Sequence, residues 1–280
     1  MSIDSISEMI ALLANKTLAH NYRWAENSII DQERKTLCDD KAIGNSIALI
    51  SLFFDACIQH LSGYLLNLKN IFPVAAYSCF RSYLETAALC AWLSDPKIKA
   101  AERLARQLTL RIHEQKYFVK PFMKEADYEM LKKQNIEKIT ALSEEGREFG
   151  LEPKLDKKIN IIGVNGAMPK ISDLIDDYFE LKHYYSFLSN IVHGHHTEMI
   201  TAGGSVGKMV NNDSMELVPI SREVKSDLVE NLEVCIKNSF GIVLDSIWEL
   251  FGWLPNELNF AELEMNHSSA SQRGSNSSKR

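Results

Sequence analysis

Hydrophobic residues recur every three or four positions along most of the chain, which is the spacing of one face of an α-helix. The most apolar of these segments runs from Ser46 to Asn70, and we expect it at the centre of the fold. The same periodicity predicts further helices over residues 4–16, 18–38, 73–93, 97–120, 127–149, 172–193 and 221–253. The pattern therefore predicts a mainly α-helical bundle.

Prolines and serines mark where several of these helices begin. Pro73 and Pro96 suit the first turn of a helix, because the N–H that proline lacks has no partner there. Ser172 and Ser221 are expected as N-caps, since a serine side chain can accept a hydrogen bond from a free backbone N–H of the first turn.

Three segments interrupt the helical pattern. Residues 150–170 carry several glycines and prolines and predict a long loop or a short strand. Two short alternating runs near 197–220 are the only segment that predicts a β-hairpin. The polar, low-complexity C-terminus predicts a disordered tail. We therefore expect a helical arm (1–42), a helical bundle with a hairpin insertion (43–258) and the tail (259–280).

Composition excludes several classes of protein. The net charge of −6 argues against a protein that coats nucleic acid non-specifically, because that binding requires a clustered excess of Lys and Arg. The five cysteines form no C-x-x-C pair, and the N-terminus resembles no secretory signal. Asp55, Gln59 and His60 interrupt the longest apolar run, which argues against a membrane span. We expect a soluble cytoplasmic protein.

The stretch "YYSFLSNIVHGHH" concentrates polar side chains at the end of a helix. One stripe of that helix carries Tyr185, Ser186, Ser189 and His193, with Asn190 at its edge. One interpretation is structural: the helix dipole favours a protonated histidine in the last turn, and Gly194 directly after it is expected as the C-cap. The other is chemical: His193 would act as an acid or base on a group held by Ser189 and Asn190.

A second candidate cluster is "RSYLE", in which Arg81 and Glu85 lie one turn apart inside an alanine-rich helix. They could form a structural salt bridge at the rim of the bundle. Alternatively, Arg81 faces His193 and offers its guanidinium to a phosphate or carboxylate.

Other motifs predict less. Arg103, Arg106 and Arg111 are expected on a solvated helix face, which could bind phosphate together with Lys97 and Lys99. The histidines of "HGHH" match no zinc-site spacing, so we expect no metal. No phosphate-binding or dinucleotide-binding glycine motif is present, and we expect no cofactor.

Two motifs carry a resemblance to a known superfamily. One is Arg81-Ser82-x-x-Glu85, and the other runs from Tyr185 through Leu188 and Ser189 to Val192 and His193. Together they resemble a subgroup of bacterial helical proteins distantly similar to the HEPN superfamily. That superfamily contains helical bundles, frequently dimeric, that act in toxin–antitoxin and anti-phage systems, and many of its members are metal-independent ribonucleases.

The resemblance leaves two functions open. The catalytic HEPN signature is an arginine, a polar residue and then a histidine on the same helix; where the arginine should be, this chain has Leu188, or Phe187 and Ser186 at the longer spacings. If Arg81 replaced that arginine, the resemblance implies a ribonuclease that uses His193 and Arg81. If Glu85 neutralises Arg81, it implies a binding or regulatory module. The implied partners are RNA, a nucleotide or a protein, the implied assembly is a homodimer, and whether the protein is an enzyme stays open.

Overall fold

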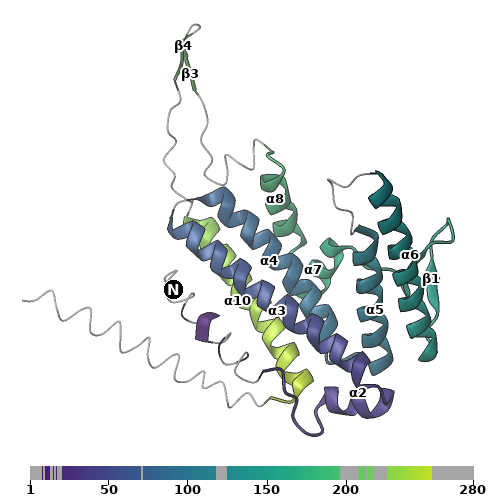
Figure 1. Ribbon diagram of the computed structural model, residues 1–280. Coiled ribbons are helices and arrows are strands. Elements are labelled where there is room, and N and C mark those ends of the chain that lie inside the picture. The colour runs from purple at the N-terminus through teal and green to yellow at the C-terminus, as the bar shows by residue number, and fades with distance from the viewer. Residues whose placement is uncertain are drawn as a thin grey trace, which may run out of the picture.

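The computed structural model is mainly helical, as the sequence predicts (Figure 1). It describes residues 21–70, 72–117, 125–195, 208–211, 214–216 and 226–253, together with residues 8, 10–12, 15 and 17. The expected tail (259–280) lies outside these residues.

Three long helices form the centre of the fold. These are α3 (Asp40–Lys69), α4 (Pro73–Ser94) and α10 (Ser226–Phe251). Pro73 occupies the start of α4 as expected, and the side chain of Asp39 caps α3. Between α4 and α10, Tyr83 and Ser239 share a buried hydrogen bond of 2.7 Å. The alanine-rich helix α4 is buried along most of its length, which makes it the axis of the core.

Helices α3 and α4 run antiparallel and approach closely. The Cys57 thiol donates to Thr86 Oγ1 at 3.4 Å, and Cys90 Sγ lies 3.7 Å from the carbonyl oxygen of Ile50. Nearer the loop that joins the two helices, a Cβ added at Gly63 would lie 3.1 Å from Cys79 Sγ. The small residues along this seam therefore set the register of the pair.

The predicted helix over 172–193 is two helices, α7 (Ile171–Phe179) and α8 (Lys182–Val192). Glu180 adopts a left-handed conformation with φ 58°, and its N–H bonds to the carbonyl of Asp176 as in a helix C-terminus. Continuous apolar spacing does not reveal such a break, because both halves keep their apolar residues toward α4. Lys170, not Ser172, occupies the N-cap position of α7, so that N-cap prediction was wrong.

A smaller second core lies to one side of the bundle. It is enclosed by α5 (Ala100–Tyr117), α6 (Glu125–Glu148) and a hairpin of β1 (Pro153–Leu155) and β2 (Ile161–Val164), at the right of Figure 1. The expected hairpin near 197–220 is also present, as β3 (Lys208–Asn211) and β4 (Ser214–Glu216). The expectation of only one hairpin was therefore wrong. For residues 150–170 the sequence predicted a long loop or a short strand, and the structure has two short strands there.

The N-terminal arm contributes to the bundle. Its helix α2 (Ile29–Leu37) begins at the N-cap Ser28, and residues 21–28 are not helical, so the expected helix over 18–38 was too long. The Trp253 side chain donates to the carbonyl of Arg23, and the Ala25 N–H donates to the carbonyl of Phe251. The non-helical segment thus packs against the end of α10.

Two of the three arginines of α5 do not lie on a solvated face, contrary to expectation, whereas the third, Arg111, is 32% exposed and lies 3.7 Å from Glu145 of α6. Arg103 is 1% exposed and forms two hydrogen bonds with Glu33, at 2.8 and 3.1 Å. Arg106 lies over the Trp92 ring and donates to the Trp92 carbonyl. Both guanidinium groups donate to backbone carbonyls at the C-terminal end of α4. The pattern of charges along α5 does not predict these contacts.

Helix α3 is long and apolar enough, by length and composition, to cross a membrane. One third of its apolar window is buried in the protein, and Phe54, Leu61 and Tyr64 are fully buried in the core. The structure is therefore compatible with a soluble protein.

Candidate functional site

Three polar side chains meet where α4 contacts α8. Arg81 Nη2 lies 2.9 Å from Glu85 Oε1 in an ion pair one turn along α4. From α8, the Tyr185 hydroxyl donates to the same Glu85 oxygen at 2.8 Å and accepts from Arg81 Nη2 at 3.4 Å. The guanidinium carbon also lies 5.5 Å from the centre of the Tyr185 ring. We call Arg81, Glu85 and Tyr185 the polar triad.

The triad lies partly within the protein. The side chains of Arg81 and Glu85 are 24% and 32% exposed. Burial raises the pKa of Tyr185, and the hydrogen bond to the Glu85 carboxylate raises it further, so the phenol stays protonated and donates to that carboxylate. Arg81 Nε is buried and makes no hydrogen bond within the described part of the chain. The triad therefore combines a compensated charge pair with one unused guanidinium donor.

His60 of α3 lies beside the triad. The α3–α4 register, set by Cys57 with Thr86 and Gly63 with Cys79, places His60 level with the middle of the triad's segment of α4. Burial lowers the pKa of His60, and the Glu85 carboxylate opposes that shift. His60 therefore interacts electrostatically with Glu85, although no sequence pattern assigned it a role in a site.

His193 lies further along α8, at its C-cap position. Gly194 has φ +75°, its N–H bonds to the carbonyl of Ile191, and the His195 N–H bonds to that of Asn190. This is the pattern of a helix closed by a left-handed glycine, so the predicted capping role of Gly194 is confirmed. His193 is exposed to solvent.

Helices α7 and α8 pass α4 in the antiparallel sense. Tyr178 donates to Asp95 at the C-terminal end of α4, whereas Tyr185 contacts the middle of α4. His193 therefore lies beyond Arg81, about 12 Å along α8 from Tyr185 at the usual helical rise. Among the described residues, no hydrogen bond or ion pair joins His193 to Arg81.

Ser189 and Asn190 lie between these two positions and are half-buried. The structure brings together Arg81 and Glu85 of the predicted site residues, and leaves Ser189, Asn190 and His193 as a separate row toward the end of α8. The chemical roles predicted for them stay predictions. Within the described residues, no group of three or more His, Cys, Asp or Glu could hold a metal ion, and His196 and Glu198 lie outside them.

A family model matches residues 47–204, which is more than half of the chain, and its description is a family of unknown function, DUF5677. The chain belongs to the DUF5677 family. The match contains His60 and the whole polar triad, and it ends before the β3–β4 hairpin. No curated protein and no solved structure matches the chain significantly.

The sequence indicated some of this site and missed the rest. Helical spacing was enough to pair Arg81 with Glu85, because residues four apart share a face. Tyr185 was placed on the polar stripe of its helix, but its two hydrogen bonds depend on the angle at which α8 crosses α4. The position of His60 beside Glu85 depends on the α3–α4 register of this DUF5677 chain, which no local sequence pattern predicts.

Proposed function

We propose that this protein is a HEPN-like, non-catalytic module that binds a partner in a bacterial defence or toxin–antitoxin type system in the cytoplasm. The observation that carries the proposal is the ion pair between Arg81 and Glu85. An arginine that stabilises a scissile phosphate must offer its charge to that phosphate. Here a carboxylate 2.9 Å away and the Tyr185 hydroxyl already engage the guanidinium.

The position of His193 supports the same function. General acid–base catalysis requires the histidine within hydrogen-bond reach of the group that it protonates or deprotonates. His193 lies about two helical turns along α8 from Tyr185, and among the described residues no hydrogen bond or ion pair joins it to Arg81. The ribonuclease that uses His193 and Arg81 is therefore the second candidate. For the binding module we propose RNA, a nucleotide or a protein as partner, and a homodimer as the assembly.

Growth of the expressing bacterium separates the two functions. We expect expression of the wild-type chain and of His193→Ala to leave growth equally unaffected, because neither cleaves RNA. Purified protein should likewise leave a labelled single-stranded RNA intact. Slower growth with the wild-type chain, relieved by His193→Ala and accompanied by RNA cleavage, would overturn the proposal in favour of the ribonuclease.

Removing the charge of Glu85 tests whether it masks Arg81. In Glu85→Gln, the guanidinium keeps its charge and loses the carboxylate. If RNA is the partner, binding measured by fluorescence anisotropy should tighten, and its logarithmic salt dependence should steepen by about 0.7, the value for one phosphate contact on a single strand. Glu144→Gln is the matched control, because Glu144 pairs with Arg147 at 2.6 Å on the exposed surface of α6. Equal responses in both variants would mean that Glu85 does not mask a binding cation.

A further inference from the structure

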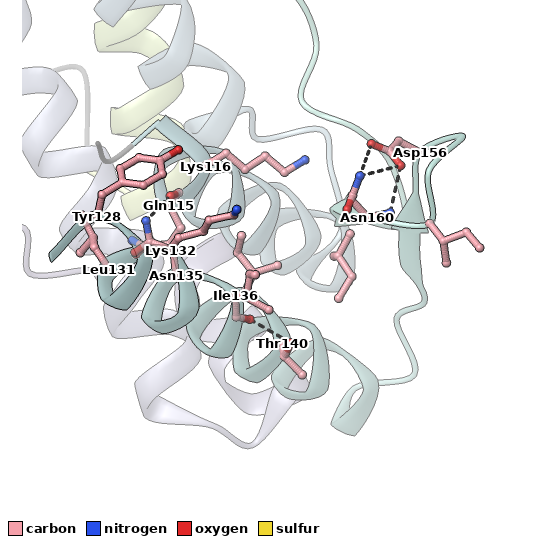
Figure 2. Close-up of a pocket in the computed structure, with 13 residues that line it drawn as sticks. Gln115, Lys116, Tyr128, Leu131, Lys132, Asn135, Ile136, Thr140, Asp156 and Asn160 are labelled. Carbon is pink, nitrogen blue, oxygen red and sulfur yellow. Dashed lines mark hydrogen bonds between the residues drawn. The ribbon is translucent and has the colours of Figure 1, made fainter. Parts of the chain in front are cut away.

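A groove separate from the polar triad lies between the last turn of α5, one face of α6 and the β1–β2 hairpin (Figure 2). Its volume is about 590 Å³. Pockets for small molecules commonly have volumes of roughly 300–1,000 Å³, with apolar walls and a few oriented polar groups. The groove therefore has the size of a ligand site.

The apolar part of the lining consists mainly of isoleucine. Ile139 and Ile161 line the inner part, while Ile136 and Ile159 lie at the rim with 58% and 77% of their surface exposed. Exposed isoleucines that converge on one hollow provide an apolar surface that water covers poorly.

Ile159 adopts an unusual backbone conformation. Its φ is +63°, in the left-handed region that β-branched residues rarely occupy. The surrounding turn fixes it, since the Asp156 carboxylate accepts hydrogen bonds from the N–H groups of Lys158 and Asn160. Strained residues that the surrounding structure holds in place often mark ligand sites, and here the strain fixes an isoleucine at the rim of the groove.

Two lysines supply positive charge. Figure 2 shows the side chains of Lys116, from α5, and Lys132, from α6, extending toward the space between the helices and the hairpin. Lys116 is half-buried, and burial lowers its pKa while Asp156 opposes that shift. Among the described residues, Lys132 forms a long ion pair with the exposed Glu129, at 3.7 Å. Among the described lining residues the carboxylate is Asp156, which accepts hydrogen bonds within its own turn and keeps its negative charge near Lys116, so these residues give the groove two ammonium groups against one carboxylate.

We propose that this groove binds a small amphipathic anion, with its apolar body against the isoleucines and its carboxylate or phosphate group at Lys116 and Lys132. Neither the polar triad nor the proposed function includes this site. The shared chemistry of the ligand is a short hydrocarbon chain that ends in an anionic group.

Four probes with the same eight-carbon body test the proposal by isothermal titration: octanoate, octyl phosphate, 1-octanol and octylamine. The wild-type protein should bind octanoate or octyl phosphate saturably at one site, and the tighter of the two identifies the head group. It should bind 1-octanol more weakly and octylamine not at all, because they lack the negative charge. Absence of saturable binding by both anions overturns the proposal.

Adjacent lysines of α6 provide a matched control, since Lys132 lines the groove and Lys133 does not. Lys116→Gln should weaken the better anion about tenfold, as expected for loss of a charge-assisted hydrogen bond at a half-buried site. Lys132→Gln should weaken it about threefold, because its ammonium is more exposed. Lys133→Gln should leave the affinity unchanged, and an equal loss in Lys132→Gln and Lys133→Gln would overturn the placement of the anion.

The apolar half of the site has its own variant. Ile159→Ser removes the rim side chain without touching the buried core, and it should weaken both anions while retaining the preference for anions over 1-octanol. Glu85→Gln should leave octanoate binding unchanged, so failure of this proposal is distinguishable from failure of the proposed function. Binding that persists undiminished in Ile159→Ser would contradict the isoleucine contact.

Discussion

Arg103 provides the most demanding test of how this fold is held together. Its guanidinium lies at the meeting point of α2, α4 and α5, where it pairs with Glu33 and donates to the carbonyls of Leu93 and Asp95. Replacement by methionine keeps an unbranched side chain that reaches only about as far as Nε, and it removes all of these donors. Arg103→Met therefore leaves a buried carboxylate and the last carbonyls of α4 without their partner.

The expected loss follows from burial on both sides of the pair. The side chains of Arg103 and Glu33 are only 1% and 6% exposed, so water cannot replace the lost partner. Removing one member of such a pair costs about 3–5 kcal/mol, chiefly the desolvation of the charge that remains. For a chain of this size, that loss corresponds to a decrease of about 10 °C in the melting temperature.

Urea unfolding followed by circular dichroism measures this loss directly. Arg147→Met is the control, because Arg147 pairs with Glu144 on the surface and should cost less than about 1 kcal/mol. In Arg103→Met, the second change Glu33→Leu should recover part of the stability, since it removes the stranded carboxylate. A free energy of unfolding of Arg103→Met within about 1 kcal/mol of the wild-type value would refute the reasoning, because a loss of that size is typical of an exposed ion pair.

Three further predictions concern the site and the hairpin. Tyr185→Phe should lower the free energy of unfolding in urea by about 1 kcal/mol through loss of its hydroxyl hydrogen bonds, whereas Tyr184→Phe should leave it unchanged. The pKa of His60 is lowered in the folded state, so the unfolded chain binds the proton more readily and the free energy of unfolding falls as the pH drops below 6.5. Between about pH 8 and about pH 5, the free energy of unfolding measured in urea should therefore decrease less in His60→Gln than in the wild type. Gly163→Ala should cost about 1–3 kcal/mol by thermal melting, because its Cβ would lie 2.0 Å from the Gly166 carbonyl oxygen, while Gly166→Ala has open space and should be near neutral.

Helical periodicity predicted the helices well where one face of the helix is consistently apolar. The start of α4 at Pro73 is an example, since proline and the alanine-rich run specify both position and burial. Periodicity failed where the chain changes direction without changing its apolar spacing. Glu180 separates α7 from α8 by a left-handed residue, and glutamate is not a typical residue for that conformation. Such a break depends on how both helices dock against α4.

Pairs within one helix were accessible from the sequence, and pairs between helices were not. Arg81 and Glu85 are four residues apart, so their contact follows from helix geometry alone. Arg103 and Glu33 are seventy residues apart, and the charges of α5 by themselves predicted a solvated surface helix. The same limitation applies to His60 and Tyr185, whose approach to Glu85 depends on the packing of α3 and α8 on α4.

The two arginine–glutamate pairs also differ in a way that bears on function. The buried guanidinium of Arg103 donates to both oxygens of Glu33 and to two backbone carbonyls. A charge that is shielded from water needs such a complete set of partners to be stable. Arg81 instead is 24% exposed, engages one oxygen of Glu85 and leaves Nε unused. Stability alone gives no reason to keep a partly satisfied charge pair at the contact of two helices. Arg103 therefore has a structural role, whereas the pairing of Arg81 leaves a donor without a hydrogen bond among the described residues.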